Sequence, residues 1–159
     1  MTTHDLFSEL NLASTLLVRH KLKVPRNALR YPDAFAAFQE VQKAGAFKDA
    51  RAILSFVPTE RTHVRFVGAW AVDGSEPGHA VSDAEIERLA AAERKLGEAL
   101  TREHIRTVWR TPKMTRYRLS PISQYDDLAG GLVVDWGPGA RAWVQWADRQ
   151  PKRVVSRST

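Results

Sequence analysis

One short segment of the chain, residues 132–145, gathers side chains that can hold a ligand. It reads LVVDWGPGARAWVQ and contains a carboxylate, a guanidinium, an amide and two indole rings. Such a set can bind a planar or anionic ligand, but it includes no obvious nucleophile and no group of metal ligands. We therefore expect binding rather than covalent chemistry at this segment. The side chains concerned are Asp135, Trp136, Arg141, Trp143 and Gln145.

The backbone between these side chains must turn sharply at Gly137, Pro138 and Gly139. Apolar residues lie on both sides of this tripeptide, so the segment predicts two strands joined as a hairpin or a tight corner. Two structural alternatives stay open. Arg141 can pair with Asp135 across the hairpin as a bridge that holds the corner. The tryptophans can instead belong to the core, because burying an aromatic ring is itself strongly stabilising.

Several other segments predict strands that would hold this corner in place. They cover residues 15–20, 52–57, 64–72, 105–110, 115–119 and 153–156. Gly68, in the middle of one of them, predicts a bulge or a close approach of the backbone to another group. By simple alternation, one face of that strand carries Val64, Phe66, Gly68, Trp70 and Val72.

Three segments have the apolar spacing of helices. They run from Asp5 to Leu10, from Asp33 through Gln42 to a stop at Gly45, and from the capping residue Ser82 to about Thr101. We find no repeat and no linker, and we predict a single α+β domain over residues 1–159. Its sheet is strongly bent and mostly antiparallel, or a small open barrel, with roughly six to eight strands and two or three flanking helices.

The chain is basic, with a net charge of +6 and a pI near 10.0. A basic surface attracts polyanions such as nucleic acids, although it also serves simply to keep a protein in solution. The chain carries three clusters of cations: Lys21, Lys23, Arg26 and Arg30; Arg102, Arg106, Arg110, Lys113, Arg116 and Arg118; and Arg149, Lys152, Arg153 and Arg157. If 105–110 and 115–119 are paired strands, the second of these clusters forms a basic two-stranded ribbon.

Several function classes have no support in the sequence. Cysteine is absent, which excludes disulfides and thiolate chemistry. No apolar run approaches the length of a membrane span and no signal peptide precedes the first strand, so we expect a cytoplasmic protein without a membrane partner or cofactor. Catalytic motifs are also missing. Two alternatives to a binding module remain, a protein-interaction or oligomerisation domain and a small metal-dependent nuclease or hydrolase that uses Asp127 and Asp135.

Four short motifs follow one another along the chain: LVRH at 17–20, FQEVQ at 38–42, FVGAWAV at 66–72 and the segment 132–145. Their order resembles that in the domain that precedes the catalytic domain in a group of bacterial GIY-YIG family nucleases. The two tripeptides that name that family are absent from this chain, so cleavage is not part of the expectation. The resemblance implies a non-catalytic module that recognises DNA and works with a nuclease, in restriction or defence.

The start of the 66–72 motif is also similar to the sheet motif of PUA-like readers such as EVE and ASCH domains. That similarity implies a pocket that holds a base or a modified base between aromatic rings. A flipped base needs ring faces for stacking, polar groups that read its edge, and cations for the phosphates. The expected rings are Trp70, Tyr125, Trp136 and Trp143; the edge contacts are Ser55, Asp135 and Gln145; the phosphate contacts are Arg19, His20, Arg116, Arg118 and Arg141.

Overall fold

The chain forms two compact units, each assembled from separate stretches of the sequence. The structure is a computed structural model that describes residues 1–98, 101–138 and 143–158. Unit 1 consists of Met1–Lys21, Asp49–Ala71 and Ser120–Thr159, and unit 2 consists of Leu22–Lys48 and Val72–Leu119. None of the helices in the described ranges is long and apolar enough to cross a membrane.

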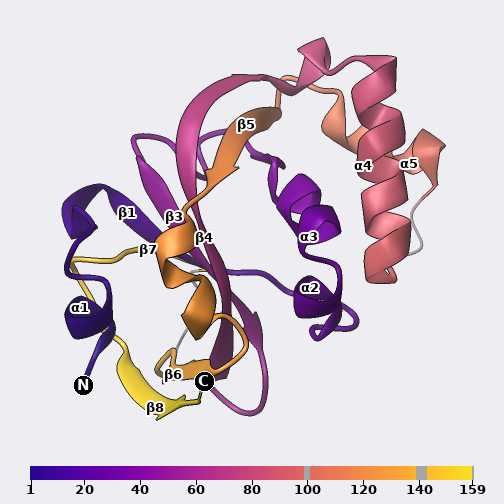
Figure 1. The fold of residues 1–159 in the computed structure, drawn as a ribbon. Coiled ribbons are helices and arrows are strands. Elements are labelled where there is room, and N and C mark those ends of the chain that lie inside the picture. The colour runs from indigo at the N-terminus through magenta and orange to yellow at the C-terminus, as the bar shows by residue number, and fades with distance from the viewer. Residues whose placement is uncertain (99–100, 139–142, 159) are drawn as a thin grey trace. The chain divides into compact units, whose positions relative to one another are not determined.

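Unit 1 is built on a mixed sheet (Figure 1). Hydrogen bonding joins its strands in the order β8-β6-β4-β3-β1-β7, in which β1 and β3 are parallel and the other pairs are antiparallel. The sheet curls into a half-barrel flanked by helices, which confirms the α+β class and the strongly bent, mostly antiparallel sheet. The strands are β1 (Thr15–Arg19), β3 (Ala52–Pro58), β4 (His63–Pro77), β6 (Leu132–Asp135), β7 (Val144–Trp146) and β8 (Arg153–Arg157).

Aromatic rings fill the core of unit 1. Phe66 lies 5.3 Å from Phe7 and 5.5 Å from Phe56, measured between ring centroids. Tyr125 and Trp136 extend this cluster, at 4.9 Å from Phe7 and 6.0 Å from Phe56 respectively. Three short helices cover the margins: α1 (Thr3–Leu6) and the 3-10 turns η1 (Leu12–Ser14) and η3 (Ser123–Leu128). The N-terminal helix is shorter than predicted and begins earlier, because Thr2 and Asp5 form its capping box.

Gly68 marks a β-bulge, as its position within the strand predicts. Ser55 pairs with Gly68, but the next residue, Phe56, pairs with Phe66, so that Val67 is the extra residue. The bulge changes which side chains share a face. Phe66 and Ala69 both lie in the core cluster, so the simple alternation from Val64 to Val72 is wrong beyond the bulge.

Unit 2 packs helices beside the far half of β4. Strand β2 pairs with β5 in an antiparallel register, and β5 neighbours β4. Ile86, Leu89, Ile105 and Trp109 bury the helix faces in a second core cluster. The elements are α2 (Asn27–Arg30), α3 (Pro32–Gln39), β2 (Val41–Lys43), η2 (Gly78–Ala80), α4 (Asp83–Leu96), α5 (Arg102–Trp109) and β5 (Met114–Pro121).

The prediction of a strand at 105–110 is wrong, because this segment is helix α5. Thr101 caps the helix by accepting a hydrogen bond from the backbone N–H of His104 (3.1 Å). Ile105 and Trp109, four residues apart, are both buried, which is the spacing of a helix face. The basic two-stranded ribbon therefore does not form.

Three other boundaries differ from the sequence expectation. Helix α3 ends at Gln39, and the next residues form β2 because Val41–Lys43 pair with Met114–Arg116. Strand β4 continues beyond its predicted end at residue 72 as far as Pro77. In these two places pairing with a distant strand overrides the local pattern. Helix α4 ends at Leu96, before the predicted end near Thr101, because Gly97 caps it in the left-handed conformation with a φ of 89°.

The strands beside the Gly137–Gly139 tripeptide do not form a hairpin. Strand β6 is already hydrogen-bonded on both edges, to β4 and to β8, so neither edge is free to accept β7. Strand β7 pairs with β1 instead. The chain does turn at Gly137, whose φ of +97° lies in the left-handed region that favours glycine. Residues 139–142, including Arg141, lie outside the described ranges.

The bulge generates a first prediction. A Cβ added at Gly68 would lie 2.7 Å from the Trp70 ring, so Gly68→Ala should lower the free energy of unfolding by about 1–3 kcal/mol. Urea unfolding measures this change. Gly74→Ala in the same strand is the matched control, because an added Cβ there meets nothing within 4 Å. Equal stability of Gly68→Ala and the wild type would contradict the close contact.

Glu93 of α4 generates a second prediction, because its carboxyl group is buried in unit 2. The residue is 1% exposed, and burial raises its pKa from 4.5 to about 8, with a further contribution from Glu98. The folded protein therefore holds this proton more tightly than the unfolded chain, and stability is lost as the pH rises from 4.5 through about 8.

Glu93→Gln removes this titration while it keeps the side chain's shape. We expect similar stability to the wild type at about pH 5, and a variant more stable by about 1–3 kcal/mol at about pH 9. Urea unfolding at the two pH values tests this expectation. Glu87→Gln, on the exposed side of the same helix, is the control. A difference from the wild type that does not change with pH would refute the assignment.

Candidate functional site

Lys152 is an unusual side chain in unit 1, because its ammonium group is buried. The residue is 5% exposed, and Nζ donates hydrogen bonds to the backbone oxygen of Trp136 (2.9 Å) and to Oε1 of Gln145 (2.6 Å). Thr3 holds its backbone in place through two hydrogen bonds of 2.9 Å. Both acceptors of the ammonium are neutral, so these hydrogen bonds orient the positive charge without neutralising it.

The Trp136 ring has two cations beside it. Nζ of Lys152 lies 4.9 Å from the ring centroid, and Cζ of Arg19 lies 5.7 Å from it. An indole ring attracts cations through its quadrupole, and this attraction is strengthened where water is excluded. Burial lowers the pKa of Lys152; Asp135 opposes that effect, and Arg19 adds to it. The result is a positive region around a buried aromatic ring.

Asp135 holds the turn that follows β6. Its Oδ1 accepts hydrogen bonds from Thr62 Oγ1 (2.6 Å) and from the backbone N–H of Gly137 (3.0 Å), and Oδ2 lies 3.4 Å from Arg153. These interactions, led by the Thr62 hydroxyl, lower the pKa of Asp135. This carboxylate therefore has a structural task at the corner, which is the kind of role that the bridge alternative assigns to it.

Trp143, the first described residue after position 138, lies next to His20. Their rings are 6.2 Å apart between centroids, and the backbone oxygen of Trp143 accepts a hydrogen bond from the N–H of Arg19 (2.8 Å). His20 is buried, whereas Trp143 is half-buried. Trp143 is therefore an aromatic side chain that retains an accessible surface, on a residue whose backbone is hydrogen-bonded to that of Arg19. Arg141, expected in the same set, belongs to residues 139–142, outside the described ranges.

Three more of the expected ligand contacts are buried, as Trp136 and His20 are. Trp70 and Tyr125 are 6% and 7% exposed, and Ser55 is fully buried at the bulge. Tyr125 packs against Phe7, and Trp70 packs over Gly68. Their burial agrees with the alternative that strand aromatics belong to the core.

Arg116 and Arg118 belong to unit 2, and carboxylates surround them. Arg116 pairs with Glu76 (2.9 Å), Glu85 (3.2 Å) and Glu40 (3.4 Å). Arg118 lies 3.6 Å from Glu76, and the hydrogen bond from Arg116 lowers the pKa of that acid. These arginines therefore support an internal ion-pair network, and much of their charge is compensated.

Lys152 is the residue of the site that sequence reasoning missed. The sequence places it in a basic tail with Arg149, Arg153 and Arg157, and no local pattern distinguishes it from them. Its burial depends on contacts with Thr3 and Trp136, which are distant in the sequence. Only the tertiary structure separates this lysine from its neighbours.

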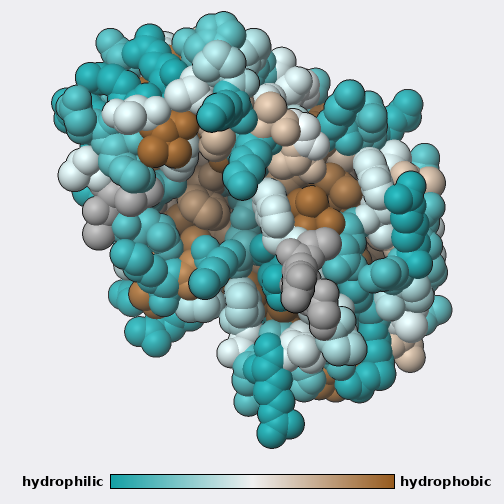
Figure 2. All heavy atoms as spheres, turned by 180° about the vertical axis from the view of Figure 1, so that it is seen from behind, coloured by the Kyte–Doolittle hydropathy of each residue, from teal (hydrophilic) through white to brown (hydrophobic). Residues whose placement is uncertain are grey.

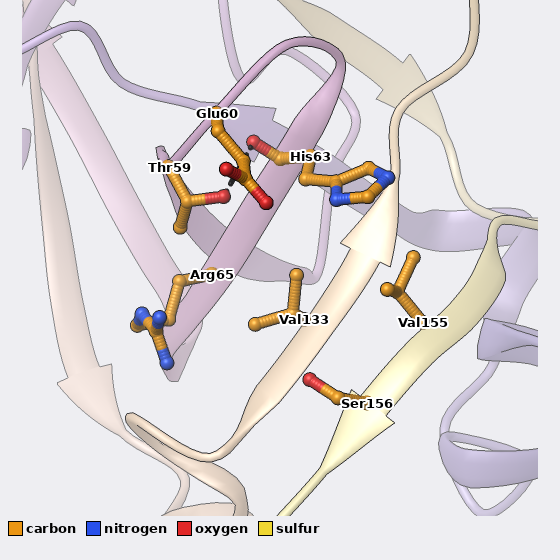
Figure 3. A pocket seen from close by; sticks show the side chains of 7 residues that line it. All are labelled: Thr59, Glu60, His63, Arg65, Val133, Val155 and Ser156. Atoms are coloured by element: carbon orange, nitrogen blue, oxygen red, sulfur yellow. Dashed lines mark hydrogen bonds between the residues drawn. The ribbon is translucent and has the colours of Figure 1, made fainter.

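A separate pocket of about 370 Å³ opens in unit 1 between the β3–β4 turn, β6 and β8. Figure 3 shows Glu60 and His63 at one end of it and Ser156 at the other, with Val133 and Val155 between them. The serine and the histidine therefore do not form a nucleophile and base pair in this arrangement. Within the described ranges, no cluster of three or more His, Asp or Glu side chains could hold a metal ion.

The buried lysine generates a third prediction. Because the pKa of Lys152 is lower in the folded protein than in the unfolded chain, the folded protein binds this proton less tightly. The free energy of unfolding therefore rises as the pH increases toward 10.5, since the charge that is costly to bury is lost. The stability of the wild type relative to Lys152→Met should therefore increase between about pH 7 and pH 10. Urea unfolding measures both proteins, and Lys48→Met removes an exposed lysine as the control. A constant difference across that range would contradict the prediction.

Compared with family models, curated proteins and solved structures, the chain matches none. The resemblance of the 132–145 motif and its companions therefore stays a prediction. What the site can do is argued below from the geometry of unit 1.

Proposed function

We propose that this protein is a non-catalytic nucleic-acid-recognition module whose binding site lies in unit 1 beside Trp143. The observation that carries the proposal is the pair of cations, Lys152 and Arg19, at the Trp136 ring, with the buried ammonium hydrogen-bonded to neutral oxygens. A positive region of this kind, next to a half-buried indole, is complementary to an anion attached to a flat ring. A nucleotide has that chemistry.

The side chains of the site divide into two groups. Trp136 and Lys152 are buried, so they set the electrostatic potential and hold the backbone. Arg19 and Trp143 are half-buried and can contact a ligand directly. A guanidinium forms paired hydrogen bonds with phosphate oxygens, and an indole stacks on a base at roughly 1–3 kcal/mol.

Gln145 adds the polar group that reading a base edge requires. Its Oε1 is held by Lys152, which orients the amide. Alternation along β7 places Gln145 and Trp146 on opposite sides of the strand, and Trp143 directly precedes it. This alternation provides a matched control for binding experiments.

DNA is the partner that we propose first, including duplexes that carry modified or damaged bases. The resemblance to the accessory domain of GIY-YIG nucleases and the similarity to PUA-like readers support this choice, and the curled sheet is compatible with the second. On the same basis, we propose a nuclease domain, in this or a neighbouring protein, as the partner in restriction or defence.

The character of the surface supports a charged rather than an apolar partner. Figure 2 shows a face that is mostly hydrophilic, with apolar residues in small separate areas. In the described part of the chain, the exposed large hydrophobic side chains are Met1, Val108 and Val155. Protein-protein interfaces usually need a larger apolar centre.

A fourth prediction tests this function. Fluorescence anisotropy with unmodified duplex, base-modified duplex, single-stranded DNA and RNA, each at two salt concentrations, should reveal binding that weakens with salt. Trp143→Ala should reduce affinity roughly 10- to 100-fold for the preferred ligand, because it removes a stacking surface. Arg19→Gln should weaken binding by a similar factor for every sequence, because it removes a contact to phosphate rather than to a base.

Trp146→Ala is the control, since it removes an indole from β7 on the side of that strand opposite to Gln145. It should leave affinity within about twofold of the wild type, once circular dichroism has shown that the fold is intact. Failure of the wild-type protein to bind any of the four nucleic acids at low salt would end the proposal. Equal losses of affinity in the Trp143 and Trp146 variants would contradict the placement of the binding site beside Trp143.

A further inference from the structure

Unit 2 carries a second positive surface, formed where α2 meets the end of α4. Asn27 Nδ2 donates a hydrogen bond to the backbone oxygen of Leu96 (3.0 Å), and the N–H of Lys23 donates to Glu98 Oε1 (2.9 Å). These bonds join the start of α2 and the residues before it to the C-terminal end of α4 and the residues after it. The exposed cations that result, which we call the α2–α4 basic surface, are Lys23, Arg26, Arg30, Arg94 and Lys95.

Two of these cations lie beside the ring of Tyr31. Cζ of Arg30 and Nζ of Lys95 each lie 5.3 Å from the centroid of its ring. Two like charges near one ring repel each other, and the ring quadrupole offsets part of that repulsion. The negative end of the α4 dipole, close to Arg94 and Lys95, offsets more of it. The charges are therefore held in place before any ligand arrives.

The cations of this surface differ from the other arginines of unit 2 in their partners. Arg102 pairs with Glu87, Arg106 and Arg110 pair with Asp83, and Arg116 pairs with three glutamates. Within the described ranges, no ion pair includes a member of the α2–α4 basic surface. Its nearby acids in the chain are Asp33, Glu93 and Glu98. Glu93 is buried, with a pKa raised to about 8, and Glu98 already accepts the N–H of Lys23.

We propose that the α2–α4 basic surface binds the phosphate backbone of a nucleic acid, without reading its sequence. The inference rests on the proposed function, to which it adds a second contact region with a different task. Several uncompensated cations in one place match the regular charge of a phosphodiester chain. No exposed large hydrophobic side chain belongs to this surface in the described ranges, so it lacks the apolar groups with which peripheral proteins enter a lipid interface.

A fifth prediction tests this inference through the salt dependence of binding. For duplex DNA the slope of log affinity against log salt is about −0.9 for each phosphate contact, so the double variant Arg30→Gln and Lys95→Gln should reduce its magnitude by roughly 1.8. Affinity at low salt should fall for every sequence to a similar extent. The double variant Arg102→Gln and Arg106→Gln, which removes the same charge from ion-paired exposed arginines, should leave the slope unchanged.

The outcomes separate this inference from the proposed function. If the wild type binds duplex DNA and the Arg30 and Lys95 variant keeps its slope and affinity, the α2–α4 basic surface is not the contact and the site beside Trp143 stands. If both double variants lose affinity to the same extent, the change in net charge explains the loss and the inference fails. Binding of the wild type to vesicles containing phosphatidylserine, abolished by the Arg30 and Lys95 variant while duplex binding is unchanged, would also overturn it.

Discussion

Unit 1 depends on the packing of Trp136. Its backbone N–H donates to Thr62 O (2.8 Å), its carbonyl accepts from Lys152, and its ring packs against Phe56 at 6.0 Å. The residue is 2% exposed, and its backbone and ring together join the end of β6 to β3, to the β3–β4 turn and to the tail before β8. Removing its ring would leave a cavity and take away the aromatic face beside the buried ammonium, which would keep its two hydrogen bonds.

The same anchoring explains how a positive site can exist in the interior of a small protein. A buried ammonium is costly unless hydrogen bonds orient it and a polarisable group lies nearby. Trp136 supplies a carbonyl and a ring face, and Gln145 supplies an amide oxygen. A carboxylate in place of these neutral groups would form an internal ion pair and cancel the attraction for an anion. The choice of neutral partners is therefore what makes the site a candidate receptor.

Charge compensation also distinguishes surfaces that look alike in the sequence. Arg116 and Arg118 belong to the denser basic cluster of the chain, yet Glu40, Glu76 and Glu85 pair with Arg116, and Glu76 also lies beside Arg118. The sparser cluster before α3 keeps its charges exposed, and α4 adds Arg94 and Lys95 to it. Proximity to acids, rather than the number of arginines, decides which surface can attract phosphates.

The sequence alone determined the α+β class, the bent sheet, the bulge at Gly68 and the N-cap of α4, because these follow from local periodicity, turn residues and capping. It could not determine that 105–110 is a helix, because its charged side chains fit either structure until Ile105 and Trp109 are seen to share a core. Nor could it tell which ligand candidates are buried. The burial of Trp136 and Lys152, and the exposure of part of Trp143, arise from partners distant in the chain. Only the tertiary structure decided them, since pairing and packing override local preference wherever a distant strand or side chain offers more buried contact.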